Sequence, residues 1–396
     1  MLLYWMWYAL LPQLSLRQKL ALLEHFSDPE DIHTRDRYDD IEVVTPEIAA
    51  ALGNKELSHA RKVISQCAEK QISILTFQDA SYPSRLRNIP DPPLVLYYKG
   101  VLPDLAGKPV IGVVGTRKAT TYGVTTARGM SRQIAACGGL VVSGGARGVD
   151  TAALEGALDA GGQVAAVLGC GVDVVYPKAN KELFDRIAKN GCLISEYLPD
   201  AEPMHWQFPA RNRIISGLSN GVLVVEAPEK SGALITARRA FEQGRDVFVV
   251  PGNIGVETCA GSNALLQDCA SAALSGWDVL KDYAPRYPGV VEKREPEPTE
   301  LPPSLLMVAQ PTDAPRDKKD IDNPERKAYS DHEIDLSAFD EQERLILSCL
   351  DGSPRATDDV IARVGLPSAA VLSILTKLAL NGVVINHPGR KVSVRR

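Results

Sequence analysis

The sequence predicts an α/β fold, an extended Rossmann-like domain in which helices cover both faces of a doubly wound parallel sheet. Between residues 109 and 282, apolar runs of strand length alternate with segments of helical periodicity. The runs are almost continuously apolar, which is typical of strands buried on both faces. Glycine-rich turns follow several of them. Because the carboxyl ends of parallel strands share one edge of a sheet, we expect these turns to lie together.

The N-terminal part is predicted to be helical. Residues 1–80 are expected to form a small all-α domain of the SAM or helix-hairpin-helix type, beginning with an amphipathic helix. A proline-rich connector follows, and residues 94–98 are expected to form an edge strand. The apolar N-terminal run is too short to span a bilayer and lacks the basic residues of a signal peptide, so we expect no membrane association.

The Rossmann-like domain is expected to span residues 81–290. Its strands are predicted at 110–114, 140–142, 164–168, 193–195, 222–225 and 247–250. Its helices are predicted at 124–136, 151–160, 181–189, 212–218, 233–243 and 263–269. Consecutive parallel strands require right-handed crossovers, so the predicted helices are divided between the two faces of the sheet.

The C-terminal part changes character twice. Residues 291–335 are rich in proline and charge and poor in aromatic side chains, which predicts a disordered linker. Residues 336–396 regain periodicity, with helices expected at 340–350, 357–364 and 368–381 and a hairpin that turns at residues 388–389. Three helices followed by a hairpin predict a winged helix, which could contact DNA or a protein.

Composition and motifs exclude several classes of protein. The net charge of −5 means that any nucleic-acid surface must be a local patch. The seven cysteines include no CxxC pair, which favours reduced thiols in the cytoplasm, and no cluster has metal-ligand spacing. Neither GxGxxG nor GxxxxGK[ST] occurs, and His205 is alone in the sheet domain. We therefore expect no cofactor, no metal and no catalytic residues.

The first two turns are basic. From Lys108 to Arg147 the chain has six basic residues and no acidic one. Arg117 follows the first strand, and Arg147 lies in the glycine-rich turn after the second. Backbone N–H groups in such turns, together with the N-terminus of the following helix, favour an anion, most plausibly phosphate. Arg147 could instead pair with Asp150, which we expect to be an N-terminal helix residue rather than a catalytic acid.

Two further basic turns, YPKAN and FPARNRIISG, follow in the sequence, and the segment SGALITARRA comes after them. Since all are predicted at one edge of the sheet, they suit an extended polyanion, and single-stranded nucleic acid fits best. Arg211 and Arg213 are two residues apart and cannot share a helix face, so one should face the groove. Phe208 and Trp206 could stack on a base, but burial is the favoured expectation. The candidate DNA-binding residues are Gly115, Thr116, Arg117, Ser143, Gly144, Gly145, Arg147, Gly148, Gly169, Gly171, Lys178, Asn180, Lys181, Arg211, Asn212, Arg213, Ser231, Gly232, Thr236 and Arg238.

Several ordered motifs resemble those of the DNA-processing protein A (DprA/Smf) family. They are VGTR, SGGARGVDTAALEGAL, VLGCGVDVVYPKAN, LISEY, FPARNRIISGLS, VVEAPEKSGALITARRAFEQGRDVFVVPG and GSNALL. The resemblance implies a cytoplasmic, non-enzymatic protein that binds single-stranded DNA, protects it and loads the RecA recombinase in natural transformation. It also implies a homodimer formed through the Rossmann-like domain. In the family, the GTR-type arginine and a lysine of the third turn hold phosphates, which corresponds to Arg117 and to Lys178 or Lys181.

The sequence departs from the family pattern at several positions. Gly145 replaces a usual leucine, Ala153 stands where a histidine is usual, and LLQDCA replaces LI-x-x-GA. The runner-up function is a nucleotide N-glycosidase of Rossmann-like fold. Such enzymes typically carry PGGxGT, whereas this chain has PGNIGVETCAG. The glycine run and its acidic partner are out of register, so binding is the favoured function.

Overall fold

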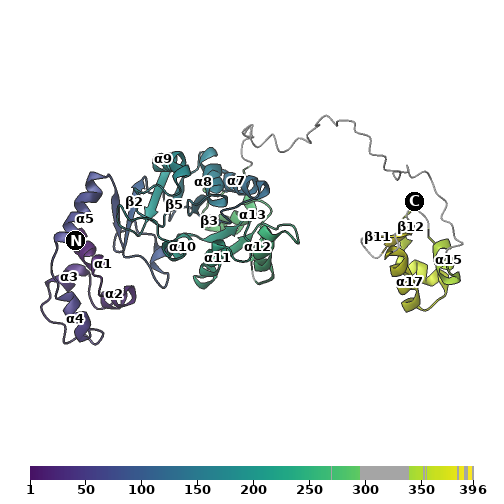
Figure 1. Ribbon diagram of the computed structural model, residues 1–396, viewed down its shortest axis with the longest axis horizontal. Coiled ribbons are helices and arrows are strands. Elements are labelled where there is room, and N and C mark those ends of the chain that lie inside the picture. The colour runs from purple at the N-terminus through teal and green to yellow at the C-terminus, as the bar shows by residue number, and fades with distance from the viewer. Residues whose placement is uncertain are drawn as a thin grey trace, which may run out of the picture. The chain divides into compact units, whose positions relative to one another are not determined.

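The computed structural model describes residues 1–268, 270–294, 339–350, 353, 355–380, 383–387 and 391–394. They belong to two compact units, one within residues 1–300 and one within residues 301–396 (Figure 1). Most of the predicted linker lies outside the described residues. Its first four positions, 291–294, pack on the first unit, where Val291 is buried and the Arg294 N–H donates to the Cys137 sulfur at 3.3 Å.

The first unit begins with a helical cluster. Its helices are α1 (Leu2–Leu10), α2 (Leu16–Leu23), α3 (Pro29–Thr34), α4 (Pro46–Leu52) and α5 (Ser58–Glu69). Helix α1 has four consecutive buried residues, Trp5, Met6, Trp7 and Tyr8, so all sides of the helix are covered at this turn. The prediction that the first helix is amphipathic is therefore wrong. The polar group of a buried aromatic side chain needs a hydrogen-bond partner, and the Trp7 indole N–H donates to the Asn54 carbonyl at 2.8 Å. The helical cluster therefore has a core of its own that continues into the sheet.

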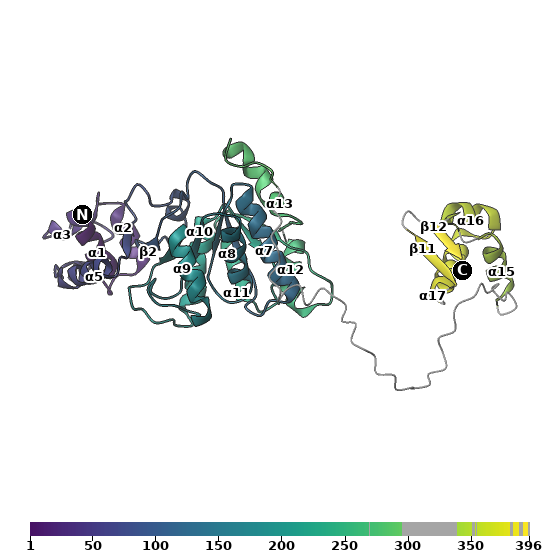
Figure 2. The same cartoon turned by 90° about the horizontal axis from the view of Figure 1, so that it is seen from above.

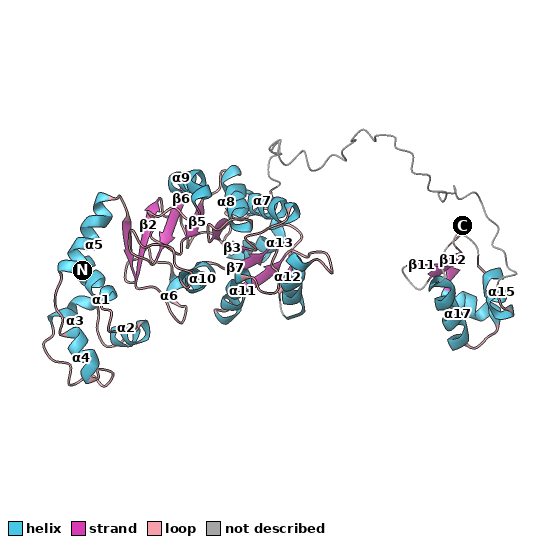
Figure 3. Cartoon of the chain, in the orientation of Figure 1, coloured by secondary structure: helices cyan, strands magenta, loops and turns pink. Residues whose placement is uncertain are grey.

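A nine-stranded sheet follows, in the order β1-β2-β6-β5-β4-β3-β7-β8-β9 (Figure 3). The strands are β1 (Ser73–Thr76), β2 (Val95–Gly100), β3 (Val110–Val114), β4 (Leu140–Ser143), β5 (Val164–Val167), β6 (Gly191–Ser195), β7 (Gly221–Val224), β8 (Asp246–Val249) and β9 (Ser271–Ala272). Strands β3 to β9 pair in parallel, whereas β2 pairs antiparallel with both β1 and β6. The expectation of an edge strand at 94–98 is wrong because β1 covers that edge.

The strand order contains one reversal. From β3 the chain adds β4, β5 and β6 on one side, and it then returns to place β7, β8 and β9 on the other side of β3. The turns that follow β3 and β7 therefore leave the same edge of the sheet in opposite directions. Such a topological switch point opens a crevice at the carboxyl ends of the strands.

Helices cover both faces of the sheet, as the sequence predicts (Figures 1 and 2). They are α6 (Ser84–Arg87), α7 (Thr121–Ala136), α8 (Val149–Asp159), α9 (Lys181–Asn190), α10 (Gln207–Leu218), α11 (Gly232–Glu242), α12 (Glu257–Asp268) and α13 (Gly276–Leu280), with 3₁₀ turns at Lys178–Asn180 and Lys281–Arg286. In β3, Ile111 and Val113 belong to the core beneath α7 and α8, whereas Val110 and Val114 belong to the core beneath α10 and α11. The predicted doubly wound fold is confirmed.

The second unit is a winged helix. It contains α15 (Glu341–Ser348), β10 (Arg355–Ala356), α16 (Thr357–Val364), α17 (Ser368–Leu380), β11 (Val384–His387) and β12 (Lys391–Val394). Strand β12 pairs with both β10 and β11, and Ile346, Val360 and Leu378 are fully buried in its core. The three predicted helices and the hairpin strands are present, while the predicted turn at 388–389 lies outside the described residues.

Candidate nucleic-acid interface

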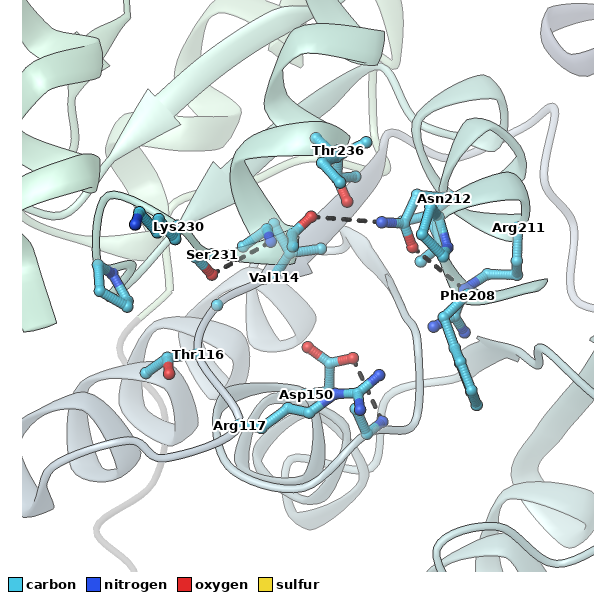
Figure 4. A pocket seen from close by; sticks show the side chains of 18 of the residues that line it. Val114, Thr116, Arg117, Asp150, Phe208, Arg211, Asn212, Lys230, Ser231 and Thr236 are labelled. Atoms are coloured by element: carbon cyan, nitrogen blue, oxygen red, sulfur yellow. Dashed lines mark hydrogen bonds between the residues drawn. The ribbon is translucent and has the colours of Figure 1, made fainter. Parts of the chain in front are cut away.

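A pocket of about 360 Å³ opens at the switch point between β3 and β7 (Figure 4). It lies where the strand order predicts a ligand crevice. Four predicted segments meet there: the turn after β3, the start of α8, the start of α10 and the start of α11. The predicted site residues that line it are Gly115, Thr116, Arg117, Arg211, Asn212, Ser231, Gly232 and Thr236.

Arg117 is exposed at the rim of the pocket, and its guanidinium carbon lies 5.0 Å from the centre of the Phe208 ring. No ion pair with another described residue holds it, so its donors remain accessible to an anion. The backbone around it is fixed. The Thr116 N–H donates to the Glu226 carbonyl at 2.7 Å, and Gly148, with φ +78°, would place a Cβ 2.9 Å from the Arg117 carbonyl oxygen. The first turn thus presents a free side chain on a rigid frame.

Arg211 forms the floor of the pocket with an exposed fraction of only 4%. Its Nη1 donates to the carbonyl oxygens of Gly144, at 2.7 Å, and Val167. Burial, with a smaller contribution from nearby Arg117, lowers the Arg211 pKa to about 10, although Asp150 raises it. A guanidinium with that pKa stays charged at neutral pH, so the floor carries a fixed positive charge.

Asp150 lies beside this floor, in the first turn of α8. Burial raises its pKa from 3.8 to about 6, although Arg211, the Ala146 N–H and Arg117 each lower it. The Ala146 N–H donates to its carboxylate at 3.3 Å, and in the described part of the chain no hydrogen bond or ion pair joins it to Arg147. The expected position at a helix start is confirmed. The proposed alternative pair with Arg147 is not formed, because Arg147 is exposed while Asp150 is buried and lines the pocket (Figure 4).

The start of α11 closes the opposite wall. Ser231 caps the helix by accepting the Ala233 N–H at 3.2 Å, and Asn212 donates to the Gly232 carbonyl at 3.3 Å. Lys230 is exposed just before the cap and lines the pocket. The positive end of a helix and a lysine therefore face the arginines across the pocket (Figure 4).

The third predicted turn lies next to the pocket rather than in it. Asn180 is buried, and its amide donates to the Gly145 carbonyl at 3.0 Å and to the Thr151 hydroxyl at 2.8 Å, which ties the third turn to the second. Lys178 and Lys181 are both exposed and neither lines the pocket. They stay available to a ligand that extends beyond it.

Other predicted residues have structural positions. The buried Ser143 hydroxyl donates to the Val113 carbonyl at 2.7 Å. Arg213 is buried and pairs with Glu196 at 2.7 Å and Asp91 at 3.2 Å, so of the two α10 arginines only Arg211 faces the groove, as expected. Arg238 lies on the far side of α11, in a separate apolar groove against α12.

The glycines of these turns have packing roles. Gly145 has φ +65°, which favours glycine, and a Cβ at Gly144 would lie 2.7 Å from both the Arg211 Nη2 and an Asp150 carboxylate oxygen. Gly169 packs against Phe208, whose ring would lie 2.8 Å from an added Cβ. A Cβ added at Gly171 would lie 2.8 Å from the Leu198 carbonyl oxygen. These glycines therefore allow close packing around the pocket.

The aromatic side chains near the pocket are more exposed than expected. Trp206 has an exposed fraction of 63%, and Phe208 is half-buried with Arg117 over its face. Tyr176, from the third turn, is 40% exposed and its ring centre lies 5.5 Å from that of Phe208. The favoured expectation of burial is wrong for Trp206, because it is the N-cap residue of α10 and lies outside both cores that flank the sheet.

Sequence reasoning missed three residues of this region. Lys230 lies in the motif EAPEKSGAL, where it resembles an ordinary surface charge. Its position directly before the N-cap of a helix could have indicated a role in anion binding. Asp150 was placed correctly, but nothing in the sequence indicated that it is buried beside Arg211. Tyr176 could have been found from its place between two predicted anion-binding residues, since stacking side chains often interleave with basic ones.

Comparison with known proteins identifies the family. Residues 73–284, more than half of the chain, match the family model of DNA recombination-mediator protein A. The chain belongs to this family. Residues 330–390 match the DprA winged helix domain. Membership of the DNA recombination-mediator protein A family places the chain among DNA-processing proteins, as the motifs of the strand-end turns predicted.

Individual relatives agree with this assignment. The chain is 35% identical to Protein Smf of Synechocystis over 88% of its own length and 86% of the relative's. It is 40% identical to the DNA processing protein DprA of Bacillus subtilis, over 57% of this chain and 76% of the relative. The solved DNA processing protein A of Streptococcus pneumoniae superposes with a TM-score of 0.61 and 37% identity, over 70% of this chain and 96% of that chain.

A second solved relative concerns a ligand. The structure of DNA processing protein A from Helicobacter pylori, described by its single-stranded DNA binding mode, superposes with a TM-score of 0.50 and 32% identity, over 55% of this chain and 97% of that one. Within the described part of this chain, no three His, Cys, Asp or Glu residues are grouped as metal ligands. None of the described helices is long and apolar enough to cross a membrane.

Proposed function

We propose that this protein binds single-stranded DNA without sequence preference, protects it and loads RecA on it in natural transformation. It acts in the cytoplasm as a homodimer and without catalysing a reaction. The observation that carries the proposal is the exposed Arg117, which lies over Phe208 at the rim of the switch-point pocket. The H. pylori relative, whose structure is described by its binding of single-stranded DNA, supports the same ligand.

The choice of a single strand rests on the aromatic side chains. Arg117 and the exposed Lys178 suit phosphates, while Tyr176, Phe208 and Trp206 offer ring faces between and beside them. Stacking on such rings requires unpaired base faces, which a duplex keeps within its own stack. Because every base has a π-face, this mode of binding tolerates any sequence.

The experiment is a titration of the full chain with oligothymidylate, mixed-sequence single strands and the matching duplex, followed by fluorescence anisotropy. We expect similar affinities for the two single strands, weaker binding to the duplex and a steep decrease in affinity with salt. Each phosphate contact contributes about −0.7 to the log–log slope on single strands. Preference for the duplex, or a strong dependence on base sequence, would contradict the proposal.

One observation favours the runner-up function. Asp150 is a buried acid with a pKa of about 6 in a switch-point pocket, and acids of this kind are common in active sites. A nucleotide N-glycosidase would release free base from a nucleoside monophosphate. Chromatography of such a reaction separates the two functions, because robust turnover that Asp150→Asn abolishes would replace the binding-protein proposal by an enzymatic one.

The homodimer and the RecA contact rest on the family resemblance. Light scattering of the full chain tests the first, and a monomer at micromolar concentration would contradict it. RecA filament formation on single strands coated with a single-strand-binding protein tests the second. We expect the protein to speed filament formation and Arg117→Ala to reduce that effect, because loading requires the protein to hold the strand.

A further inference from the structure

We propose that the switch-point pocket binds a terminal phosphate, the phosphomonoester dianion at the end of a DNA strand or of a free nucleotide. Internal phosphodiesters of the same strand then bind outside it, towards Lys178. The inference rests on the proposed function, because it names the part of the nucleic acid that the pocket holds. Three features of the pocket carry it: its floor, its helix wall and its net charge.

The floor contains a donor that no protein group uses, on an arginine side chain that is almost entirely buried. Arg211 has an exposed fraction of 4%. Its Nε donates to the Asn212 amide oxygen at 3.3 Å and its Nη1 donates to two backbone carbonyls, whereas its Nη2 has no acceptor among the described residues. Buried polar groups in folded proteins are almost always paired. A guanidinium donor left over in a pocket therefore indicates an anionic ligand.

The helix wall offers a further donor. In helix α11, which has 11 residues, the Ser231 hydroxyl accepts the Ala233 N–H and the Ser231 carbonyl accepts the Leu234 N–H at 3.2 Å. The Gly232 N–H has no acceptor in the described part of the chain, and a Cβ added at Gly232 would meet nothing within 4 Å. The first turn of the helix is thus open to a ligand on the side that faces Arg211 (Figure 4). Free N–H groups at a helix start bind phosphate oxygens well.

The charge of the lining favours a dianion. Arg117, Arg211 and Lys230 contribute three positive charges and Asp150 contributes one negative charge when ionised, which leaves a net charge of +2. A phosphomonoester carries about −1.5 to −2 at neutral pH, whereas a phosphodiester carries a single negative charge. The terminal phosphate therefore matches the charge of the pocket, and its three free oxygens give Arg117, Arg211 and the start of α11 one acceptor each.

The test compares oligothymidylates that differ only in their ends. Fluorescence anisotropy at fixed ionic strength measures the affinities of a strand with a 5′-phosphate, a strand with a 3′-phosphate and a strand with two hydroxyl ends. We expect one phosphorylated strand to bind about tenfold more tightly than the hydroxyl strand, which corresponds to one strong charge-assisted contact. Competition with thymidine monophosphate, against sodium sulfate as the ionic control, shows whether a free nucleotide enters the same pocket.

A matched pair of variants locates the effect. Lys230→Gln and Lys178→Gln each remove one exposed lysine. Of these two lysines, Lys230 lines the pocket and Lys178 does not. Lys230→Gln should reduce the preference for the phosphorylated end to about threefold or less, while Lys178→Gln should weaken all three strands alike and preserve the preference. Thermal melts confirm that both variants are folded.

Two results separate this inference from the proposed function. Equal affinities for all three strands, with no competition by the nucleotide, would overturn the terminal-phosphate site and leave single-strand binding intact. Failure of every strand to bind, while the nucleotide still binds, would overturn the proposed function and leave the pocket assignment standing. A preference that survives Lys230→Gln but is lost in Lys178→Gln would also overturn the inference, because the end would then lie outside the pocket.

Discussion

Replacement of Asp150 by asparagine is expected to stabilise the free protein and to tighten its hold on phosphate. Burial raises the pKa of this carboxyl from 3.8 to about 6, despite the nearby Arg211 and Arg117. At about 1.4 kcal/mol per pH unit, an ionised Asp150 costs the folded state about 3 kcal/mol. Because the folded state holds the proton more tightly than the unfolded chain, this cost is complete above about pH 6 and fades as the pH falls towards 4.

The same charge opposes an anion in the pocket. We expect wild-type affinity for oligothymidylate to rise as the pH falls from about 8 through 6, because protonation of Asp150 removes a negative charge from beside the phosphate. Asp150→Asn should bind about fivefold more tightly at about pH 8, which corresponds to about 1 kcal/mol for a charge pair that is partly exposed to solvent. Its affinity should then change little between about pH 8 and 5. Its free energy of unfolding should exceed that of the wild type by the full amount above about pH 6, and the difference should fade towards pH 4.

Anisotropy titrations and urea unfolding at constant ionic strength measure the two effects. His205 lines the same pocket, so His205→Asn is the matched control. The reasoning is refuted if Asp150→Asn weakens binding at every pH, since the carboxylate would then be needed to position Arg117 and Arg211. It is also refuted if His205→Asn alone removes the pH dependence.

Four further predictions follow from the interface. Arg117→Ala should weaken binding to every sequence and reduce the magnitude of the log–log salt slope by about 0.7, and an unchanged slope would show that Arg117 is not a ligand. Trp206→Ala should cost about 1–3 kcal/mol of affinity without changing that slope, as measured by the same titration. Gly148→Ala should lower the melting temperature, because φ +78° and the Arg117 carbonyl together exclude a Cβ at a cost of at least about 1 kcal/mol. Removal of residues 336–396 should leave most single-strand affinity intact, and loss of most affinity would move the principal site to the winged helix.

The fold was largely predictable because its strands are continuous apolar runs. The prediction at 110–114 coincides with β3, and the runs at 164–168 and 247–250 lie within one residue of β5 and β8. The shortest strands could not be predicted from apolar runs. Strand β1 has four residues and follows a helix after a short turn, and β9 has two exposed residues, so neither shows a periodicity that could be recognised. Pairing with β2 and β8, rather than local sequence, defines them.

The candidate site was predictable as a set of turns but not as a pocket. Strand-end glycines and arginines identified the turn of Arg117 and the starts of α10 and α11. Which of them meet depends on the strand order, and the order is decided by tertiary packing that no local motif encodes. Arg238 illustrates the limit, since it lies two residues after Thr236 on the same helix and yet faces a different groove. Helical periodicity separates the two side chains, and only the packing of α12 shows which one meets the ligand.

A buried carboxylate explains why the first turn can leave Arg117 free. Glu226 has no exposed surface and follows β7, and its side chain accepts the Thr120 N–H at 2.9 Å and the Thr120 hydroxyl at 3.2 Å and also bonds to Thr258 of α12. This one group joins the turn after β3, the end of β7 and the start of α12 across the switch point. The backbone that carries Arg117 is therefore ordered before any ligand arrives, so binding needs to order only the side chain and costs less conformational entropy. The contacts of the buried Glu226 carboxylate are little screened by salt, whereas the contacts of the exposed Arg117 with an anion are screened. A protein of net charge −5 can hold a polyanion in this way, because a local basic patch lies on a fixed backbone.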